Sequence, residues 1–166
     1  MRIIVVGAGE VGTYVADRLS RQEHDIALIE LDPERFRQID AELDVLAING
    51  SGTDPAALQR AGIDDADLLV AATNKDEINL FSALLARQAG VNKTIVRVES
   101  RKLRSKEVSA LFDKFDDHLV IDPDQEVADS VLRLMEYPGA MDLSRMADEE
   151  VVIIGARLPA HAPMVG

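Results

Sequence analysis

The stretch IIVVGAGEVG, residues 3–12, decides the fold. It starts as a short apolar run and ends in three glycines with the spacing G-x-G-x-x-G. The run predicts a buried strand, and residues 11–22 have the apolar spacing of a helix. A strand that passes through this glycine pattern into a helix is typical of a dinucleotide-binding turn.

Each glycine of the turn has its own physical reason. Gly7 permits the tight turn, Gly9 has no Cβ to keep a pyrophosphate from the backbone, and Gly12 lets the helix pack close to the sheet. The free N–H groups at the helix start, near Glu10 and Val11, attract phosphate charge. The alternative is a tight strand–helix turn that binds nothing.

Glu30 stands at the end of the second expected strand, 18 residues after Gly12. This is the usual place for the acid that accepts hydrogen bonds from the adenosine ribose. A carboxylate there repels a 2′-phosphate, which favours NAD over NADP. Asp32 is the rival acid, although its place before Pro33 is better explained as a helix N-cap.

Strands and helices alternate along the chain. Apolar runs predict strands at 2–7, 25–31, 45–48, 67–73, 94–98 and 118–122, and helices are expected at 11–22, 33–42, from 55, 76–89 and 102–113. Strands that are apolar throughout indicate a parallel sheet covered on both faces. The prediction is therefore an α/β fold, a Rossmann-like doubly wound parallel sheet of about six strands.

Further candidate residues follow the third and fourth strands. Gly50 and Ser51 would border the adenine, unless this loop is only a glycine-rich connector. Thr73 and Asn74 would line the middle of the crevice. The acidic residues at 76 and 77 are explained well enough by the helix dipole.

Arg97 interrupts the apolar run TIVRV at residues 94–98. A buried guanidinium needs an anionic partner. Either a nucleotide phosphate in the crevice or an internal carboxylate would supply one, and the sequence leaves both open.

The chain changes character after Pro123. Residues 124–137 predict a helix whose apolar stripe covers either its own sheet or a partner subunit, and a strand-like run follows at 150–158. We therefore expect a nucleotide-binding domain at 1–123, a crossover helix and linker at 124–147, and the start of a truncated C-terminal lobe at 148–166.

Composition excludes several classes. The net charge is −12, which repels nucleic acid and anionic lipid. The chain has no cysteine and no apolar run near the ~18 residues of a membrane span, so we expect a cytoplasmic protein. Its three histidines are scattered, and no metal-ligand or nucleophile pattern is present. We expect no enzyme activity; the alternative is an NAD-dependent oxidoreductase whose catalytic half is absent.

Four longer stretches carry a family resemblance: MRIIVVGAGEVG, GIDDADLLVAATNKDEINL, RVES and VLRLMEYPGAMDL. With them the sequence resembles the RCK, or KTN, domain family, and within it the N-terminal domains of the bacterial Trk potassium uptake regulators. The second and last stretches are more specific than the glycines. A nucleotide-binding module of another transporter or channel would look much the same.

The resemblance implies a regulatory subunit that binds NAD(H), and often ATP or ADP, without doing chemistry on it. It also implies a homodimer that assembles into rings beneath a membrane potassium transporter, with no nucleic acid bound and no insertion into lipid. The implied nucleotide contacts are Gly7, Ala8, Gly9, Glu10, Val11, Gly12, Glu30, Leu31, Gly50, Ser51, Thr73, Asn74 and Arg97. Relatives with arginine at the position of Glu10 reach the γ-phosphate of ATP, which Glu10 does not. No metal site is expected, because Asp124 is better explained as a helix cap.

Overall fold

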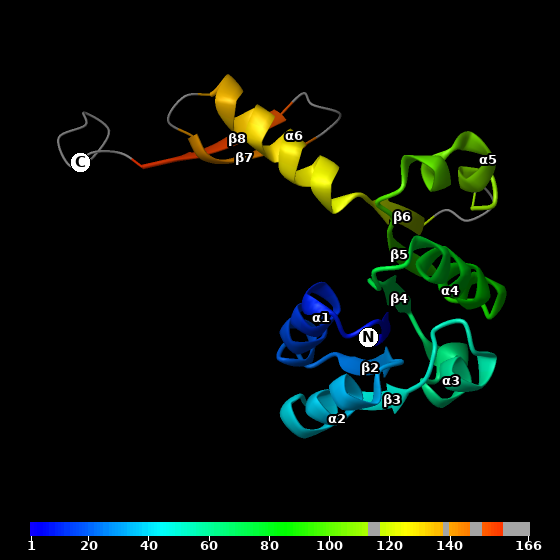
Figure 1. Cartoon of the computed structure of the whole chain (residues 1–166). Coiled ribbons are helices and arrows are strands. Elements are labelled where there is room, and N and C mark those ends of the chain that lie inside the picture. The colour runs from blue at the N-terminus through cyan, green and yellow to red at the C-terminus, as the bar shows by residue number, and fades with distance from the viewer. Residues whose placement is uncertain (113–116, 138–139, 147–150, 158–166) are drawn as a thin grey trace. The chain divides into compact units, whose positions relative to one another are not determined.

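The computed structural model describes residues 1–112, 117–137, 140–146 and 151–157. The chain divides into two compact units, Met1–Asp122 and Pro123–Gly166. The first unit holds all six strands of one parallel sheet, and the second holds a helix and a strand pair (Figure 1).

The sheet of the first unit has the strand order β3-β2-β1-β4-β5-β6. The bounds are β1 (Arg2–Val6), β2 (Asp25–Glu30), β3 (Leu46–Asn49), β4 (Leu68–Ala71), β5 (Lys93–Arg97) and β6 (Asp117–Ile121). β1 is central and pairs with both β2 and β4, so that Val6 lies opposite Ile29 on one side and Ala71 on the other. The Rossmann-like doubly wound sheet is confirmed.

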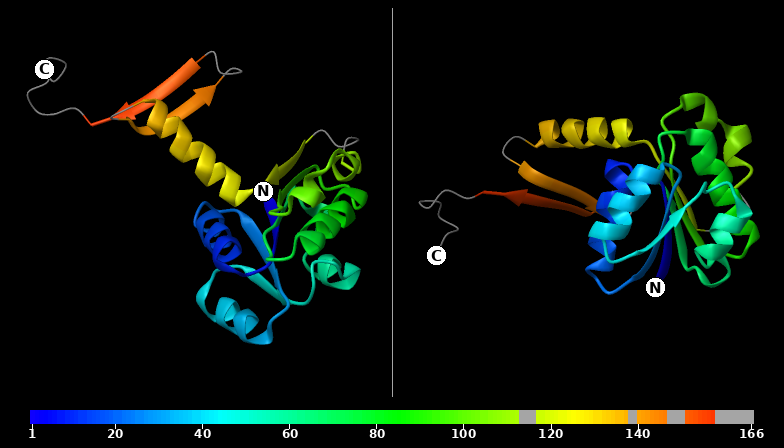
Figure 2. Two further views of the ribbon diagram at one scale, coloured as in Figure 1. Left: turned by 45° about the horizontal axis from the view of Figure 1, so that its top comes forward. Right: turned by 60° about the horizontal axis from the view of Figure 1, so that its bottom comes forward.

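Helices cover both faces of this sheet (Figure 2). They are α1 (Glu10–Ser20), α2 (Pro33–Glu42), α3 (Pro55–Arg60), α4 (Asp76–Gln88) and α5 (Lys106–Ser109), with short 3-10 turns η1 (Ile63–Asp65) and η2 (Arg101–Arg104). Ile3 and Val5 of β1 pack in one core cluster with Ala16 of α1 and Ile39 of α2. The period of two in a strand sends the alternate residues of β1 to the other face.

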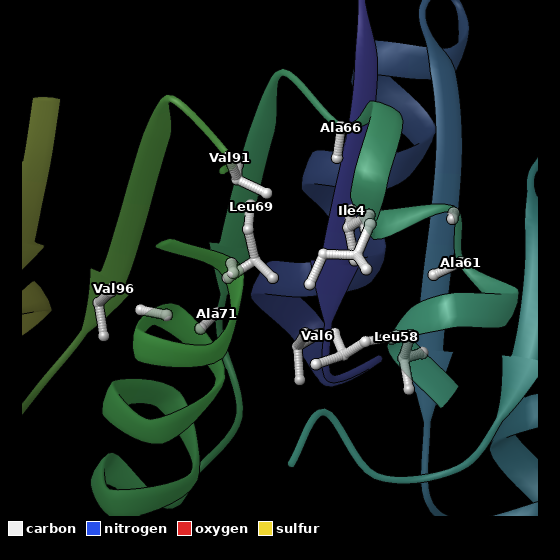
Figure 3. Close-up of a cluster of buried hydrophobic side chains, with 14 of the residues drawn as sticks. Ile4, Val6, Leu58, Ala61, Ala66, Leu69, Ala71, Val91 and Val96 are labelled. Atoms are coloured by element: carbon white, nitrogen blue, oxygen red, sulfur yellow. The ribbon is translucent and has the colours of Figure 1, made fainter. Parts of the chain in front are cut away.

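The core on that other face is aliphatic apart from Phe112 (Figure 3). Ile4 and Val6 of β1 gather with Leu69 of β4, Val96 of β5 and Leu58 of α3. All five side chains are at most 2% exposed. Their burial fixes β1, and with it the turn that follows β1.

Two local expectations are wrong. The helix expected at 102–113 is broken into η2 and α5, because Ser105 adopts an extended backbone with φ −68° and ψ 159°; residue 113 lies outside the described residues. The strands are also not all buried on both faces. Leu46 of β3 and Leu119 of β6 are 48% and 53% exposed, because each edge strand has a neighbour on one side only.

The second unit contains α6 (Pro123–Glu136) and an antiparallel pair of strands, β7 (Ala140–Met146) and β8 (Val151–Ala156). β8 falls inside the expected strand-like run, whereas β7 was not expected. Val127, Val131 and Met135 follow one another at helical spacing along α6, and all three are more than half exposed.

Candidate functional site

A cleft of about 630 Å³ opens at the carboxyl ends of the strands. The strand order reverses between β1 and β4, and in open α/β sheets this switch point is where ligands bind. Its volume falls within the usual range for small-molecule sites, about 300–1,000 Å³. Except for Ala8 and Gly12, every site residue expected from the sequence lines this cleft, namely Gly7, Gly9, Glu10, Val11, Glu30, Leu31, Gly50, Ser51, Thr73, Asn74 and Arg97.

The turn after β1 needs glycine at its first position. Gly7 has φ +95°, a left-handed conformation that other residues rarely adopt. A Cβ on Gly7 would also lie 2.7 Å from Cγ2 of Thr73. The Gly7 N–H donates to the carbonyl of Ile29 at 2.9 Å, so the turn is joined to β2 as well as to the end of β4.

Gly9 and Gly12 differ in what surrounds them. A Cβ on Gly12 would overlap the carbonyl oxygen of Gly7, whereas a Cβ on Gly9 would meet nothing within 4 Å. Gly12 is therefore required by the packing of α1 against the turn. Gly9 is required by nothing in the protein itself, and its open side belongs to the cleft.

Glu30 is the most buried acid of the cleft. It is 8% exposed, and both of its carboxylate oxygens accept backbone hydrogen bonds, from Ala8 N–H at 2.6 Å and from Asp32 N–H at 2.8 Å. The resemblance implies Ala8 as a nucleotide contact, but the N–H of Ala8 donates its hydrogen bond to Glu30. Each carboxylate oxygen has further lone pairs, so Glu30 can still accept hydroxyl protons from a ligand.

Asp32 has a different task. Its carboxylate accepts from the N–H groups of Glu34 and Arg35 at 2.8 and 3.0 Å. These backbone bonds, that of Arg35 first, lower the pKa of Asp32 below its usual value. Asp32 is the N-cap of α2, as its place before Pro33 predicted.

The loop after β3 forms the outer wall beside Glu30. The Gly50 N–H donates to the Glu30 carbonyl at 2.9 Å. The hydroxyls of Ser51 and Thr53 lie 2.8 Å apart. Ser51 therefore lines the cleft with its hydroxyl already engaged within its own loop.

The opposite wall is held by the buried amide of Asn79, near the start of α4. Asn79 of α4 is fully buried, and its side chain bonds to Thr73 at the end of β4 and to Arg97 at the end of β5. A sequence signal for it existed: Asn79 shares the buried face of α4 with Ala83 and Ala86, at i+4 and i+7. A polar residue on an apolar helix face must find partners.

Arg97 pairs with a carboxylate of the protein itself, that of Glu99, which is one of the two partners that the sequence left open. One guanidinium nitrogen bonds to Glu99, and another donates to the Thr73 carbonyl at 3.3 Å. Its Nε is buried and has no hydrogen-bond partner among the described residues. Asp76, expected to favour the helix dipole, also accepts from the N–H groups of Glu99 and Ser100 at 3.2 and 2.7 Å.

Three cations line the cleft of this acidic chain. Arg35, Lys75 and Arg97 all contribute to its surface, although the chain as a whole carries a net charge of −12. Sequence reasoning named Arg97 alone. Three acids, Glu10, Glu30 and Asp32, also line the cleft, so the formal charges balance and the positions of the cations decide where an anion can bind.

The described residues offer no second chemical centre. No group of three or more His, Asp or Glu residues in the described part of the chain is placed to hold a metal ion. His118 lies at the opposite, amino end of the sheet, where Nδ1 is 2.7 Å from the Thr94 hydroxyl and the ring stacks on Phe112 at 3.8 Å. Burial, with a smaller contribution from Arg87, lowers the pKa of His118 from 6.5 to about 4.

The two ends of the sheet therefore differ in kind. The carboxyl end has an open cleft lined by acidic and basic side chains and by the glycine turn. The amino end has His118, which is neutral and stacks on Phe112. None of the described helices is both long and apolar enough to span a bilayer.

Comparison with known proteins agrees with the fold and the turn. The TrkA-N domain family model matches residues 3–114. The Trk system potassium uptake protein TrkA of Halomonas elongata is 33% identical over 167 residues, which cover all of this chain and 36% of the relative. The chain thus spans about a third of the length of this curated relative.

Solved structures share the fold at lower identity. The TrkA-N domain of the inner membrane protein ybaL from Escherichia coli has a TM-score of 0.69 at 20% identity, over 81% of this chain and 96% of that one. The GsuK channel bound to NAD has a TM-score of 0.64 at 14% identity, over 89% of this chain and 25% of that one. With the family model covering residues 3–114, the chain belongs to the TrkA-N domain family.

Proposed function

We propose that the cleft binds NAD(H) and that the bound nucleotide regulates a potassium uptake transporter. One observation carries the first half of this proposal: Glu30 lies beside the bare glycine turn at the switch point of the sheet, with both oxygens already fixed. A ribose diol needs such an acceptor, and a pyrophosphate needs such a turn. The GsuK channel, which shares this fold and is bound to NAD, supports the same ligand class.

The residues of the cleft fit a dinucleotide. Glu30 would accept the hydroxyls of the adenosine ribose, with Leu31, Gly50 and Ser51 around the adenine. The open side of Gly9, which a Cβ would fill without touching protein, suits the pyrophosphate. The guanidinium of Arg97, a residue that lines the cleft, suits the distal half of the ligand.

ATP and ADP share the adenosine half and would use the same residues. The carboxylate of Glu10 lines the cleft close to the turn and disfavours a longer chain of phosphates. The charge of Glu10 therefore favours NAD(H) over ATP.

The role is regulatory in this proposal. The ligand contacts named here bind and orient the nucleotide, and the acids and the lysine of the cleft are assigned no chemical step on it. An oxidoreductase whose catalytic half lies outside this chain is the second candidate, because the turn alone is common to both classes.

The second unit supports an assembly. Its α6 stripe and the β8 residues Ile153 and Ile154 are exposed at 45–71%. An isolated two-stranded sheet is only marginally stable in water, so we expect these apolar faces to be buried against another surface. We propose that α6 packs on a second copy of the chain. Residues 148–166 begin a further lobe in this proposal. Rings of such dimers dock on a potassium transporter subunit at the inner face of the membrane.

Calorimetric titration of the purified protein with NADH tests the ligand, and NADPH is the control that Glu30 should reject. Absorbance at 340 nm in the presence of small carbonyl compounds tests the role. We expect NADH to bind and to stay unoxidised. Steady NADH oxidation by the full-length protein would favour the oxidoreductase.

The assembly has its own test. Gel filtration of Val131→Asp, which places a charge in the α6 stripe, should show a smaller species than the wild type. Gln125→Asp places the same charge on the other side of the helix and should leave the elution volume unchanged. A wild type that elutes as a monomer at micromolar concentration would contradict the dimer.

A further inference from the structure

Asn79 uses its whole hydrogen-bonding capacity inside the protein. Its Oδ1 accepts from the Thr73 N–H at 2.9 Å and from the Thr73 hydroxyl at 2.6 Å. Its Nδ2 donates to the carbonyls of Thr73 and Arg97, both at 2.9 Å. A side-chain amide has two donor hydrogens and an oxygen with two lone pairs, so no capacity remains for a ligand.

These four bonds join two strand ends to one helix. Thr73 follows β4 and is held at its N–H, its carbonyl and its hydroxyl. Arg97 closes β5 and is held at its carbonyl, and its own guanidinium returns to the Thr73 carbonyl at 3.3 Å. Asp76, one turn before Asn79, holds the chain that follows β5. Asn79 therefore holds the backbone from which the Arg97 side chain enters the cleft, while Glu99 pairs with the guanidinium itself.

The other half of the cleft is held separately. Glu30 fixes the Ala8 N–H at 2.6 Å, and the Gly7 N–H is fixed by the Ile29 carbonyl at 2.9 Å. None of these bonds involves α4. Loss of the Asn79 amide would thus disturb the Thr73 and Arg97 wall directly, and would reach the Glu30 wall only through the contact of Thr73 with Gly7.

We propose that Asn79 is a positioning residue that sets how strongly the cleft prefers a dinucleotide over a mononucleotide. This rests on the proposed function, in which Glu30 serves the adenosine half and Arg97 the distal half. A nucleoside monophosphate uses only the first wall, whereas a dinucleotide spans both. Asn79 touches neither ligand and acts through Thr73 and Arg97.

The test compares two ligands on the same variants. Asn79→Ala should raise the Kd for NADH by about tenfold or more, in line with the loss of one charge-assisted contact, and should change the Kd for AMP by less than about twofold. Asn79→Ser, whose shorter side chain also loses the bonds of the amide but stays polar, is a second variant and should show the same selectivity. Titration calorimetry on samples with a native circular dichroism spectrum supplies both constants.

Thr94→Val is the matched control. Thr94 is 1% exposed and its hydroxyl pairs with His118, so this variant also breaks a buried polar contact, at the far end of the sheet. It should lower thermal stability and leave the ratio of the two Kd values at the wild-type value. A merely structural role for Asn79 would give the same unchanged ratio.

A double-mutant cycle shows whether Asn79 acts through Arg97. In an Arg97→Ala background, Asn79→Ala should weaken NADH binding much less than it does in the wild type. Additive losses, or equal losses for NADH and AMP, would overturn the inference alone. A wild type that binds neither nucleotide would overturn the proposed function, and this inference with it.

Discussion

Replacement of glycine by alanine should have opposite consequences at two positions of the same turn. Gly9 has φ −70° and ψ −173°, a conformation open to alanine, and a Cβ there meets no protein atom within 4 Å. The unfolded chain loses freedom, which stabilises by about 0.4–1 kcal/mol. Alanine is a poorer N-cap, which offsets a similar amount. We expect Gly9→Ala to unfold within about 4 °C of the wild type.

The same methyl group should impair ligand binding, because it occupies the open side of the turn. Loss of one charge-assisted bond from backbone to phosphate costs about 1.5–3 kcal/mol, or about 10- to 150-fold in affinity. At a concentration of 100 times its Kd, NADH stabilises the wild type by about 2.7 kcal/mol. A variant that binds 100-fold more weakly gains only about 0.4 kcal/mol at that concentration.

Gly12→Ala is the comparison. Its Cβ overlaps the carbonyl oxygen of Gly7, so the backbone of the turn must move. Overpacking of this kind costs about 1–3 kcal/mol and, against rigid backbone, outweighs the gain of about 1 kcal/mol from removing a helical glycine. We expect a clear fall in melting temperature even without ligand.

Thermal unfolding with and without NADH, with calorimetric Kd values, measures both effects. If Gly9→Ala binds NADH within about threefold of the wild type, the open side of Gly9 is not the seat of the pyrophosphate. A Gly12→Ala variant as stable as the wild type would contradict the packing argument.

Three further outcomes are expected. Glu30→Gln should weaken NADH binding and narrow its preference over NADPH by about 30-fold at low salt, because a carboxylate about 4 Å from a doubly charged 2′-phosphate is disfavoured by about 2 kcal/mol even in water; an unchanged ratio in calorimetry would show that Glu30 does not face the ribose. Glu10→Arg should raise the affinity for ATP relative to NADH by about tenfold at low ionic strength, because the charge of the side chain is reversed about 10 Å from the two extra negative charges of ATP. Competition titration measures this ratio, and a lower relative affinity for ATP would contradict the prediction. The pKa of His118 is lowered to about 4 in the folded state, so between pH 6.5 and 4 the unfolded chain binds the proton and stability falls with acidification; denaturant titrations should show a shallower fall for His118→Phe, and parallel curves would refute this.

Most of the first unit could be predicted because its signals are local. Buried parallel strands are continuous apolar runs, and Asp32 before Pro33 marks a helix start that the structure reproduces. The spacing of Gly7, Gly9 and Gly12 is enough to predict the turn after the first strand. Glu30 could be placed because a fixed spacing relates it to the turn.

What the sequence did not predict depends on contacts between distant segments. β7 lacks a continuous apolar run, and it forms a strand because it pairs with β8 in an antiparallel ladder. Asn79 has an ordinary place in a helix, and its importance comes from bonds to residues 6 and 18 positions away. Arg35 and Lys75 reach the cleft only because the sheet brings α2 and the end of β4 to one edge.

The central place of β1 has a consequence for the order in which the protein matures during synthesis. The glycine turn leaves the ribosome before β4 does, so β1 lacks one of its two neighbours until β4 has emerged. Parallel pairing across such a separation is slow. The wall that contacts Gly7 is finished only when Asn79 and Arg97 can close around Thr73. A nascent chain that stops before Arg97 therefore lacks one wall of the cleft, and the cleft is complete only after β5 has emerged.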